Sequence, residues 1–238
     1  MKTSNKLLVA ALALVLGTVA SYDVALRAEY LTGRYKDPLQ NYTKQPNTGF
    51  DAVEVPAGLY FKVRIEAGPA GVWVNKDAAE YVRFRQNGRT LAVTLAQPEE
   101  EHFLGGREAV VIHCPQLQQL TTDSPYSAAR RKAHQGQPSG EVLVRNFNQD
   151  SLRVDQRWAG TVKLESNNLR QLRAVAGASV GSAPALEVAG SNNIQGADLA
   201  INHQSRLDLK TQIPQLRYHF SDSATVTFGG TAASALTR

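Results

Sequence analysis

Short apolar triplets at near-regular spacing are the feature of this chain that most restricts its fold. After about residue 141, an apolar residue, an intervening residue and a second apolar residue recur, starting at Leu152, Val162, Leu172, Leu186, Leu199, Leu207, Leu216 and Val226. The steps between these first residues are 10, 10, 14, 13, 8, 9 and 10. A triplet is too short to bury its own apolar face, so each one must pack against others.

Two successive steps make a coil of roughly 20 residues, which is within the range of solenoid repeats. Gly and Asn adopt left-handed backbone angles at low cost, so we expect them at the corners between strands. The asparagines that fit this role are Asn167, Asn168, Asn192, Asn193 and Asn202. The sequence therefore predicts an all-β fold of the right-handed parallel β-helix or β-solenoid type. The alternative is an antiparallel β-sandwich, which is also built from short strands at ~8–12-residue spacing.

Alternating apolar and polar residues begin at Phe50, well before the triplets. In the stretch 59–66, every second residue is apolar, which is typical of a half-buried strand. The dipeptide Asn87-Gly88 lies between two alternating runs and indicates a hairpin. No segment after residue 50 has a helical period, and the polar, turn-rich stretch 33–49 is predicted to be a linker.

The N-terminus carries an export signal. Lys2 and Lys6 precede an apolar or small run of 14 residues, which ends at Ala20. Cleavage between Ala20 and Ser21 would release a signal peptide, and Gly17 can break the helix just before that site. A membrane span needs ~20 residues, but the apolar pattern continues at helical spacing after Asp23, so residues 7–22 can also act as an uncleaved anchor. Both interpretations place the rest of the chain outside the cytoplasm.

We accordingly divide the chain into a signal peptide or anchor (1–20), a juxtamembrane helix and linker (21–48) and a β domain (49–232). Beyond residue 20 the chain has 24 basic and 21 acidic residues, a net charge of +3. This excess is too small to indicate a nucleic-acid binder, which would need a clustered basic face. A single cysteine, Cys114, excludes an internal disulfide framework and a multi-cysteine zinc site.

Residues 50–95 resemble the opening of the autotransporter adhesin head, or GIN, domain family. The shared features are a Phe-Asp start, a Val-x-Val strand, a strand near residues 60–65 and the hairpin return Gly-x-x-Leu-x-Val at 88–93. The stretch 188–196 is similar to the family's corner rich in Gly, Ser and Asn. The resemblance covers about residues 49–232 and implies an exported bacterial domain with a β-solenoid fold. The chain lacks a Gly-Ile-Asn tripeptide, Ala200-Ile201-Asn202 being the nearest, and the resemblance implies no catalytic residues.

Histidine and cysteine side chains are the first candidates for chemistry. His113 and Cys114 are adjacent, but adjacent side chains on a strand point to opposite faces, so we expect one inward and one outward residue. His203 and His219 are about one coil apart and could form a weak metal site with Asp208 or with Asp222. We favour unliganded surface histidines.

Charged loops are the second candidates. The acidic run 98–102 is interpreted as a solvated loop, because glycoside hydrolysis needs two carboxylates at a defined separation. The basic loop 129–134 contains the candidate binding residues Arg130, Arg131 and Lys132, which could contact anionic glycans or lipid headgroups.

Acids and bases alternate along the triplet region. The acids are Asp155, Glu165, Glu187, Asp198 and Asp208, and the bases among them are Arg153, Arg157, Lys163, Arg170 and Arg173. We interpret this mixture as one solvated face. The chain has no Gly-x-Ser-x-Gly, phosphate-loop or His-Glu-x-x-His motif, so we expect no catalytic residue, no metal site and no cofactor.

These observations favour a non-enzymatic, exported domain of the periplasm or cell envelope that acts in adhesion or interaction. The expected partners are an envelope glycan or protein, and the membrane through an uncleaved N-terminal segment, but not nucleic acid. A carbohydrate-active enzyme on a β-helix is one alternative. A structural module that self-associates through the end of its strand stack is the other, because such an end exposes unpaired strand edges.

Overall fold

The computed structural model divides into two units, residues 1–42 and residues 43–238. One long helix makes up most of the first unit. The structure describes residues 3–56, 61–97, 108–124 and 140–236. Helix α1 (Thr3–Thr32) continues through Gly17, so the predicted break there is wrong. A helical glycine costs only about 1 kcal/mol relative to alanine, and the leucines and alanines around it are strong helix formers.

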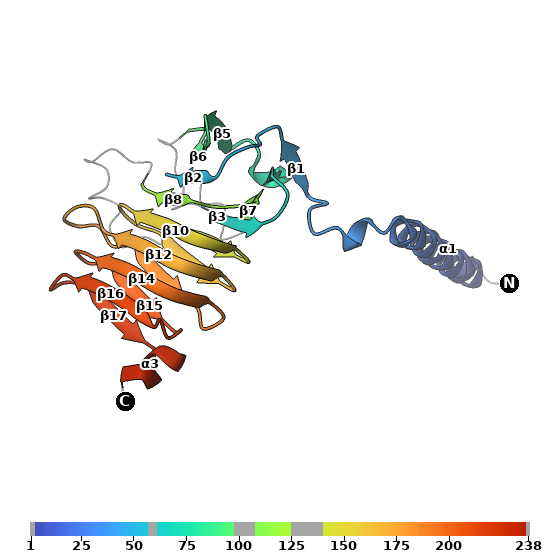
Figure 1. Ribbon diagram of the computed structural model, residues 1–238. Coiled ribbons are helices and arrows are strands. Elements are labelled where there is room, and N and C mark those ends of the chain that lie inside the picture. The colour runs from blue at the N-terminus through green and yellow to red at the C-terminus, as the bar shows by residue number, and fades with distance from the viewer. Residues whose placement is uncertain (1–2, 57–60, 98–107, 125–139, 237–238) are drawn as a thin grey trace. The chain divides into compact units, whose positions relative to one another are not determined.

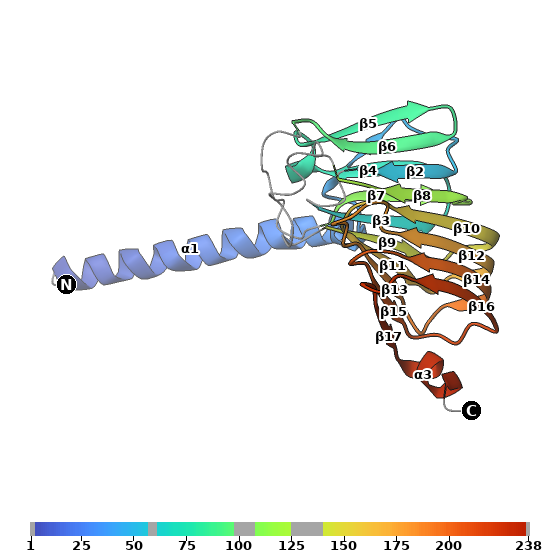
Figure 2. The same cartoon turned by 90° about the vertical axis from the view of Figure 1, so that its left-hand side faces the viewer.

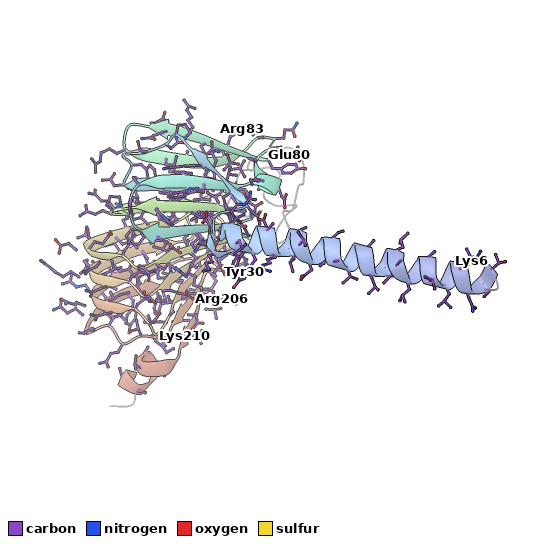
Figure 3. The ribbon with its side chains drawn as sticks, turned by 90° about the vertical axis from the view of Figure 1, so that its right-hand side faces the viewer. Lys6, Tyr30, Glu80, Arg83, Arg206 and Lys210 are labelled. Atoms are coloured by element: carbon purple, nitrogen blue, oxygen red, sulfur yellow. The ribbon has the colours of Figure 1, made fainter. Side chains whose placement is uncertain are left out.

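Helix α1 is long and apolar enough to cross a membrane. Its 30 residues span ~45 Å, more than the ~30 Å hydrocarbon core of a bilayer. The side chains project from all sides of the helix and are exposed (Figure 3). Gly33 follows it with a φ of 67°, a left-handed angle that is typical of the residue after a helix. The 3-10 turn η1 (Arg34–Lys36) comes next.

The second unit is mostly β and contains two sheets. The order of the nine-stranded sheet A is β1 (Tyr42–Gln45), β4 (Gly71–Asn75), β7 (Glu108–Cys114), β3 (Lys62–Ala67), β9 (Glu141–Arg145), β11 (Thr161–Glu165), β13 (Ala185–Val188), β15 (Arg206–Leu209) and β17 (Thr225–Phe228). The order of the eight-stranded sheet B is β16 (Gln215–Phe220), β14 (Asn193–Ile201), β12 (Asn168–Ala176), β10 (Asn148–Gln156), β8 (Gln119–Thr122), β2 (Ala52–Val55), β6 (Thr90–Leu95) and β5 (Val82–Asn87). The 3-10 turn η2 (Lys76–Ala78) and helix α3 (Gly230–Leu236) complete the elements.

From β8 to β17 the chain alternates between the sheets, and each strand pairs in parallel with the strand two further along. Leu152 is in register with Leu172, Leu172 with Ala197 and Ala197 with Leu216, which are steps of 20, 25 and 19 residues. The strands follow one another from β5 and β6 to β16 and β17 (Figures 1 and 2). Two pairs, β4 with β7 and β5 with β6, are antiparallel. Both sheets are thus predominantly parallel, while their two-layer arrangement is that of a sandwich.

The apolar residues of the triplets from Leu152 to Leu209 form the core between the sheets. Leu152, Val162, Leu186 and Leu207 are each at most 1% exposed, as the triplet pattern predicts. Full burial of a leucine or valine side chain contributes about 1.5–3 kcal/mol. Repetition of this burial along the stack provides the core that an isolated triplet lacks.

The five asparagines expected at the corners do not have the predicted left-handed backbone. Among the described residues, positive φ angles occur at Asn146, Ser166 and His203 and at glycines such as Gly160 and Gly177, so the prediction is confirmed for glycine. The corner asparagines act through their side chains: Nδ2 of Asn167 donates to Oδ1 of Asn192 at 3.0 Å. Both side chains are buried, and their amides satisfy backbone groups where the strands bend.

The sequence pattern missed three elements. Residues 33–49, predicted to be a linker, contain η1 and the strand β1. Helix α3 lies in the part of the chain after residue 50, where no segment has a helical period. Its seven residues are too few to display a helical period, so the pattern had no signal for it.

Candidate functional site

The outer face of sheet B carries a row of three arginines and one aspartate from four neighbouring strands. Arg153 on β10, Arg173 on β12, Asp198 on β14 and Arg217 on β16 are in register. Their sequence neighbours on the strands, such as Leu172 and Leu199, are buried in the core. Since side chains alternate across a strand, the arginine row points away from the core.

This row lines one side of an open hollow of about 450 Å³. We name it the arginine groove and define it by Arg153, Arg173, Val175, Asp198, Ala200, Arg217 and His219. Val175, Ala200 and His219 form the adjacent in-register row. Val175 and Ala200 in that row have short side chains, which leave room beside the longer arginines where the sheet is hollowed.

Gln171 and Asp198 organise the middle of the groove. Nε2 of Gln171 donates to Oδ2 of Asp198 at 3.3 Å. Gly196 makes room for this side chain, because a Cβ on Gly196 would lie 2.5 Å from Oε1 of Gln171. The absence of a side chain at Gly196 thus helps to place the carboxylate between Arg173 and Arg217.

The positive charge of the groove is only partly neutralised. The nearest nitrogen of Arg173 is 3.9 Å from Oδ2 of Asp198, and these side chains are 72% and 42% exposed. Ion pairs this open to solvent contribute about 0–1 kcal/mol. In the part of the chain that the structure describes, Arg153 and Arg217 have no carboxylate within 4.0 Å. Neighbouring strands are only ~4.8 Å apart, so the adjacent guanidinium groups of Arg153 and Arg173 repel each other unless an anion lies between them.

The outer face of sheet A has the opposite character, because its acids and bases pair closely. Nζ of Lys163 is 2.6 Å from Glu165, and this contact raises the pKa of Lys163. Nζ of Lys210 is 3.0 Å from Asp208. Figure 3 shows Lys210 and Arg206 on this side of the stack. The charged residues interpreted from sequence as one mixed face therefore belong to two faces. Sheet A also has a looser pair, Arg206 with Glu187 at 3.6 Å, but among the described residues the in-register row of arginines lies on sheet B.

A second charged cluster lies higher on sheet A. Glu66 accepts from Arg64 at 2.8 Å and lies 2.7 Å from Nε of Arg145. Nε2 of His113 is 3.7 Å from Glu66, and its ring is 4.7 Å from that of Trp73. Partial burial lowers the pKa of His113, against the opposing effect of Glu66. The charges of this cluster compensate one another, so it offers less to an external ligand than the arginine groove.

The predicted separation of His113 and Cys114 is confirmed. His113 faces outward, while Cys114 is fully buried and its burial raises the thiol pKa to about 12. His203 lies in the turn after β14 and His219 on the outer face of β16. Among the described residues, no group of three His, Cys, Asp or Glu side chains could hold a metal ion.

The loop residues proposed from sequence, Arg130, Arg131 and Lys132, lie outside the described residues, as does the acidic run 98–102. The cleavage-site residues Ala20 and Ser21 are both within α1. From the sequence, Arg153 and Arg173 were interpreted only as part of a mixed surface. The available signal was arginine at the centre of three triplets, as Arg153, Arg173 and Arg217, but these triplets are not consecutive and their alignment depends on which strands are paired.

No protein-family model matches the chain, and no curated protein matches it. Several solved structures are similar to it. A "putative adhesin" from Bacteroides fragilis is 12% identical, with a TM-score of 0.49 over 79% of this chain and 95% of that one. A "putative lipid binding protein" from Parabacteroides distasonis is 13% identical, with a TM-score of 0.36 over 79% and 94%. A "putative adhesin" from Parabacteroides merdae is 12% identical, with a TM-score of 0.30 over 79% and 95%. The assignment to the GIN family remains a prediction from the sequence.

Proposed function

We propose that this chain is an exported, non-enzymatic interaction module of the bacterial cell envelope, and that it binds an acidic glycan in the arginine groove. The observation that carries this proposal is the row of three arginines on the outer face of sheet B, with a single carboxylate among them. The planar guanidinium group donates two parallel hydrogen bonds to a carboxylate or sulfate. An acidic sugar offers such groups at regular intervals.

The chemistry of the groove favours binding over catalysis. Arginine stays protonated at every physiological pH and does not act as a general acid or base. Asp198 accepts a hydrogen bond from Gln171 and lies beside Arg173, so its carboxylate is already engaged by neighbouring side chains. Glycoside hydrolysis would need a second carboxylate across the bond to be cleaved.

Helix α1 supports the proposed position in the envelope. Its apolar side chains are exposed, and a membrane interior or the export machinery would accommodate them. Retention of α1 would give an anchored domain, whereas cleavage after Ala20 would give a periplasmic or released one. An intact mass and a fractionation of the exported protein distinguish these two states.

The parallel stack supports the finer fold assignment to a right-handed parallel β-helix, or β-solenoid, of the GIN type. Its support is the parallel pairing at steps of 19 to 25 residues and the asparagine side chains that bridge successive corners. In such a fold the outer faces are flat and extended, which suits a linear polymer lying across several strands.

Binding of the full-length protein to immobilised glycans tests the proposal. The array should contain acidic glycans, with uronic acid or sulfate groups, and neutral glycans of the same length. The test variant is Arg153→Glu with Arg173→Glu, and the matched control is Arg85→Glu, an exposed arginine on β5 of the same sheet.

We expect binding to the acidic glycans only, with a loss of roughly tenfold or more in the groove variant and no change in the control. Higher salt should weaken binding by the wild-type protein. Equal binding to neutral glycans, or full binding by the groove variant, would overturn the proposal. Shortened glycans in the reaction mixture would instead favour the enzyme alternative.

A further inference from the structure

The two sheets end together at β16 and β17, the last strands in their respective orders. Figures 1 and 2 show both strands at the same end of the stack, followed by α3. β16 pairs with β14 and β17 with β15. Within the described part of the chain, neither strand has a second neighbour, so each presents one free edge.

The core continues to this end and is left uncovered there. Leu216, Tyr218 and Phe220 are in register with Ala197, Leu199 and Ile201, all of which are buried. Tyr218 nevertheless is 62% exposed, and the other two are only partly buried. On β17, Val226 and Phe228 are likewise only partly buried, although they are in register with the buried Leu207 and Leu209 of β15. We name this surface the open end and define it by Leu216, Tyr218, Phe220, Val226 and Phe228.

The opposite end of the stack is covered by a hairpin. β5 and β6 form an antiparallel hairpin, and Val82 at its start is 3% exposed. Nη1 of Arg83 donates to the carbonyl oxygens of Ala79, Glu80 and Val82 there. At the open end, α3 is tied through Thr231 to Lys210 and buries Ala232, but it leaves Tyr218 exposed. Helix α3 therefore covers one corner and not the row of aromatic side chains.

The free edges restrict what can cover the open end. A partner must present two strand edges that run in opposite directions and are separated by ~10 Å, the usual distance between packed sheets. A second copy of the same end meets both conditions after a two-fold rotation, which is the symmetry of most protein dimers. We propose that two copies of this chain associate end to end through their open ends, with β16 of each copy beside β17 of the other.

Charge favours this arrangement. The outward-facing residues of β16 include Arg217 and His219, whereas those of β17 are Thr225 and Thr227. Pairing β16 with the partner's β17 thus places threonine opposite arginine. Pairing β16 with the partner's β16 would instead bring arginine and histidine side chains of the two copies together.

The size of the open end sets the expected strength. A six-residue strand is ~20 Å long, and two sheets with their side chains are ~20 Å across, so each copy buries ~400 Å². The total of ~800 Å² is below the ~1,200 Å² of most stable complexes, so association in dilute solution should be weak. Confinement of the copies to one membrane by α1 would raise their effective concentration and favour the dimer.

Chemical cross-linking of the full-length protein in bacterial membranes tests this inference. The reporter is Tyr218→Cys with a short thiol-specific cross-linker. Cys114 is buried and should stay silent. A cysteine in place of Val180, which is 85% exposed in the turn between β12 and β13, is the matched control. We expect a dimer band from the first variant and none from the second.

A second measurement, of the protein's mass in detergent, tests dimer formation without an introduced cysteine. In detergent, the wild-type mass should rise toward a dimer with concentration, and Tyr218→Glu should weaken this association roughly tenfold or more. Val180→Glu should behave as wild type. A monomer at all concentrations together with no cross-linking at position 218, or a dimer unaffected by Tyr218→Glu, would overturn the inference. The Arg153→Glu substitution changes the arginine groove but not the open end. Its effect on glycan binding therefore tests the proposed function separately from the dimer.

Discussion

Replacing Asn192 with alanine would remove the side chain that connects two corners of the strand stack. Its Oδ1 accepts from the backbone N–H of Asn167 at 3.0 Å and from Nδ2 of the same residue at 3.0 Å. Its Nδ2 donates to the carbonyl oxygens of Leu164 at 2.7 Å and Ala189 at 2.8 Å. Asn192 itself is 5% exposed, so water does not replace these bonds readily.

The loss of each of these four hydrogen bonds lowers the stability by a different amount. The Asn167 N–H would be left buried without a partner, which costs about 1–3 kcal/mol. The other three groups keep a second bond: Nδ2 of Asn167 still donates to Val144, and the carbonyls of Leu164 and Ala189 still accept from the backbone. Each of these losses costs about 0.5–1.5 kcal/mol. We therefore expect Asn192→Ala to lower the free energy of unfolding by about 2.5–7.5 kcal/mol, a large share of the 5–15 kcal/mol typical of a domain.

This change can be measured by urea unfolding of the full-length protein in detergent. The fluorescence of its two tryptophans monitors the transition. The midpoint should fall by more than about 1 M. The matched control is Asn193→Ala, which removes one exposed bond from Asn193 to Asn168 and should change stability by no more than about 0.5 kcal/mol. If Asn192→Ala shifted the midpoint no further than Asn193→Ala does, the corner asparagines would not stabilise the stack in the way we describe.

Two further predictions follow from single groups. Because Cys114 is buried with its pKa raised to about 12, a thiol reagent at pH 8 should label it only after unfolding, and labelling of the native protein would contradict its placement in the core. Arg89 donates to Asp51 and lowers the pKa of that carboxyl group. A lowered folded-state pKa means that the pair contributes its full stability above the unfolded value near 4 and loses it as the pH falls through the folded value. Asp51→Asn should therefore lower the urea midpoint at pH 7, and this effect should shrink as the pH falls below about 4; an effect that stays constant down to the acid limit of folding would refute this.

The sequence by itself determined which face of most strands points to the core, although not the exposure of Tyr218 at the end of the stack. Alternation in the triplets predicted that Leu152 and Val154 face the core, and the same rule separated His113 from Cys114. The apolar run of α1 was also predicted from the sequence, because a membrane or export signal depends on local composition. These properties depend on neighbours within a few residues, so a single sequence contains them.

Only the tertiary structure decided which charges share a face. Arg153 and Lys163 are one triplet apart but belong to opposite sheets, whereas Arg153 and Arg217 are far apart in the chain and lie in one row. That alignment depends on unequal steps between paired strands, which are 20, 25 and 19 residues long. The steps are set by backbone pairing and corner hydrogen bonds between coils. Such long-range contacts leave no periodic trace in the sequence, and so the arginine groove and the open end became visible only once the strands were paired.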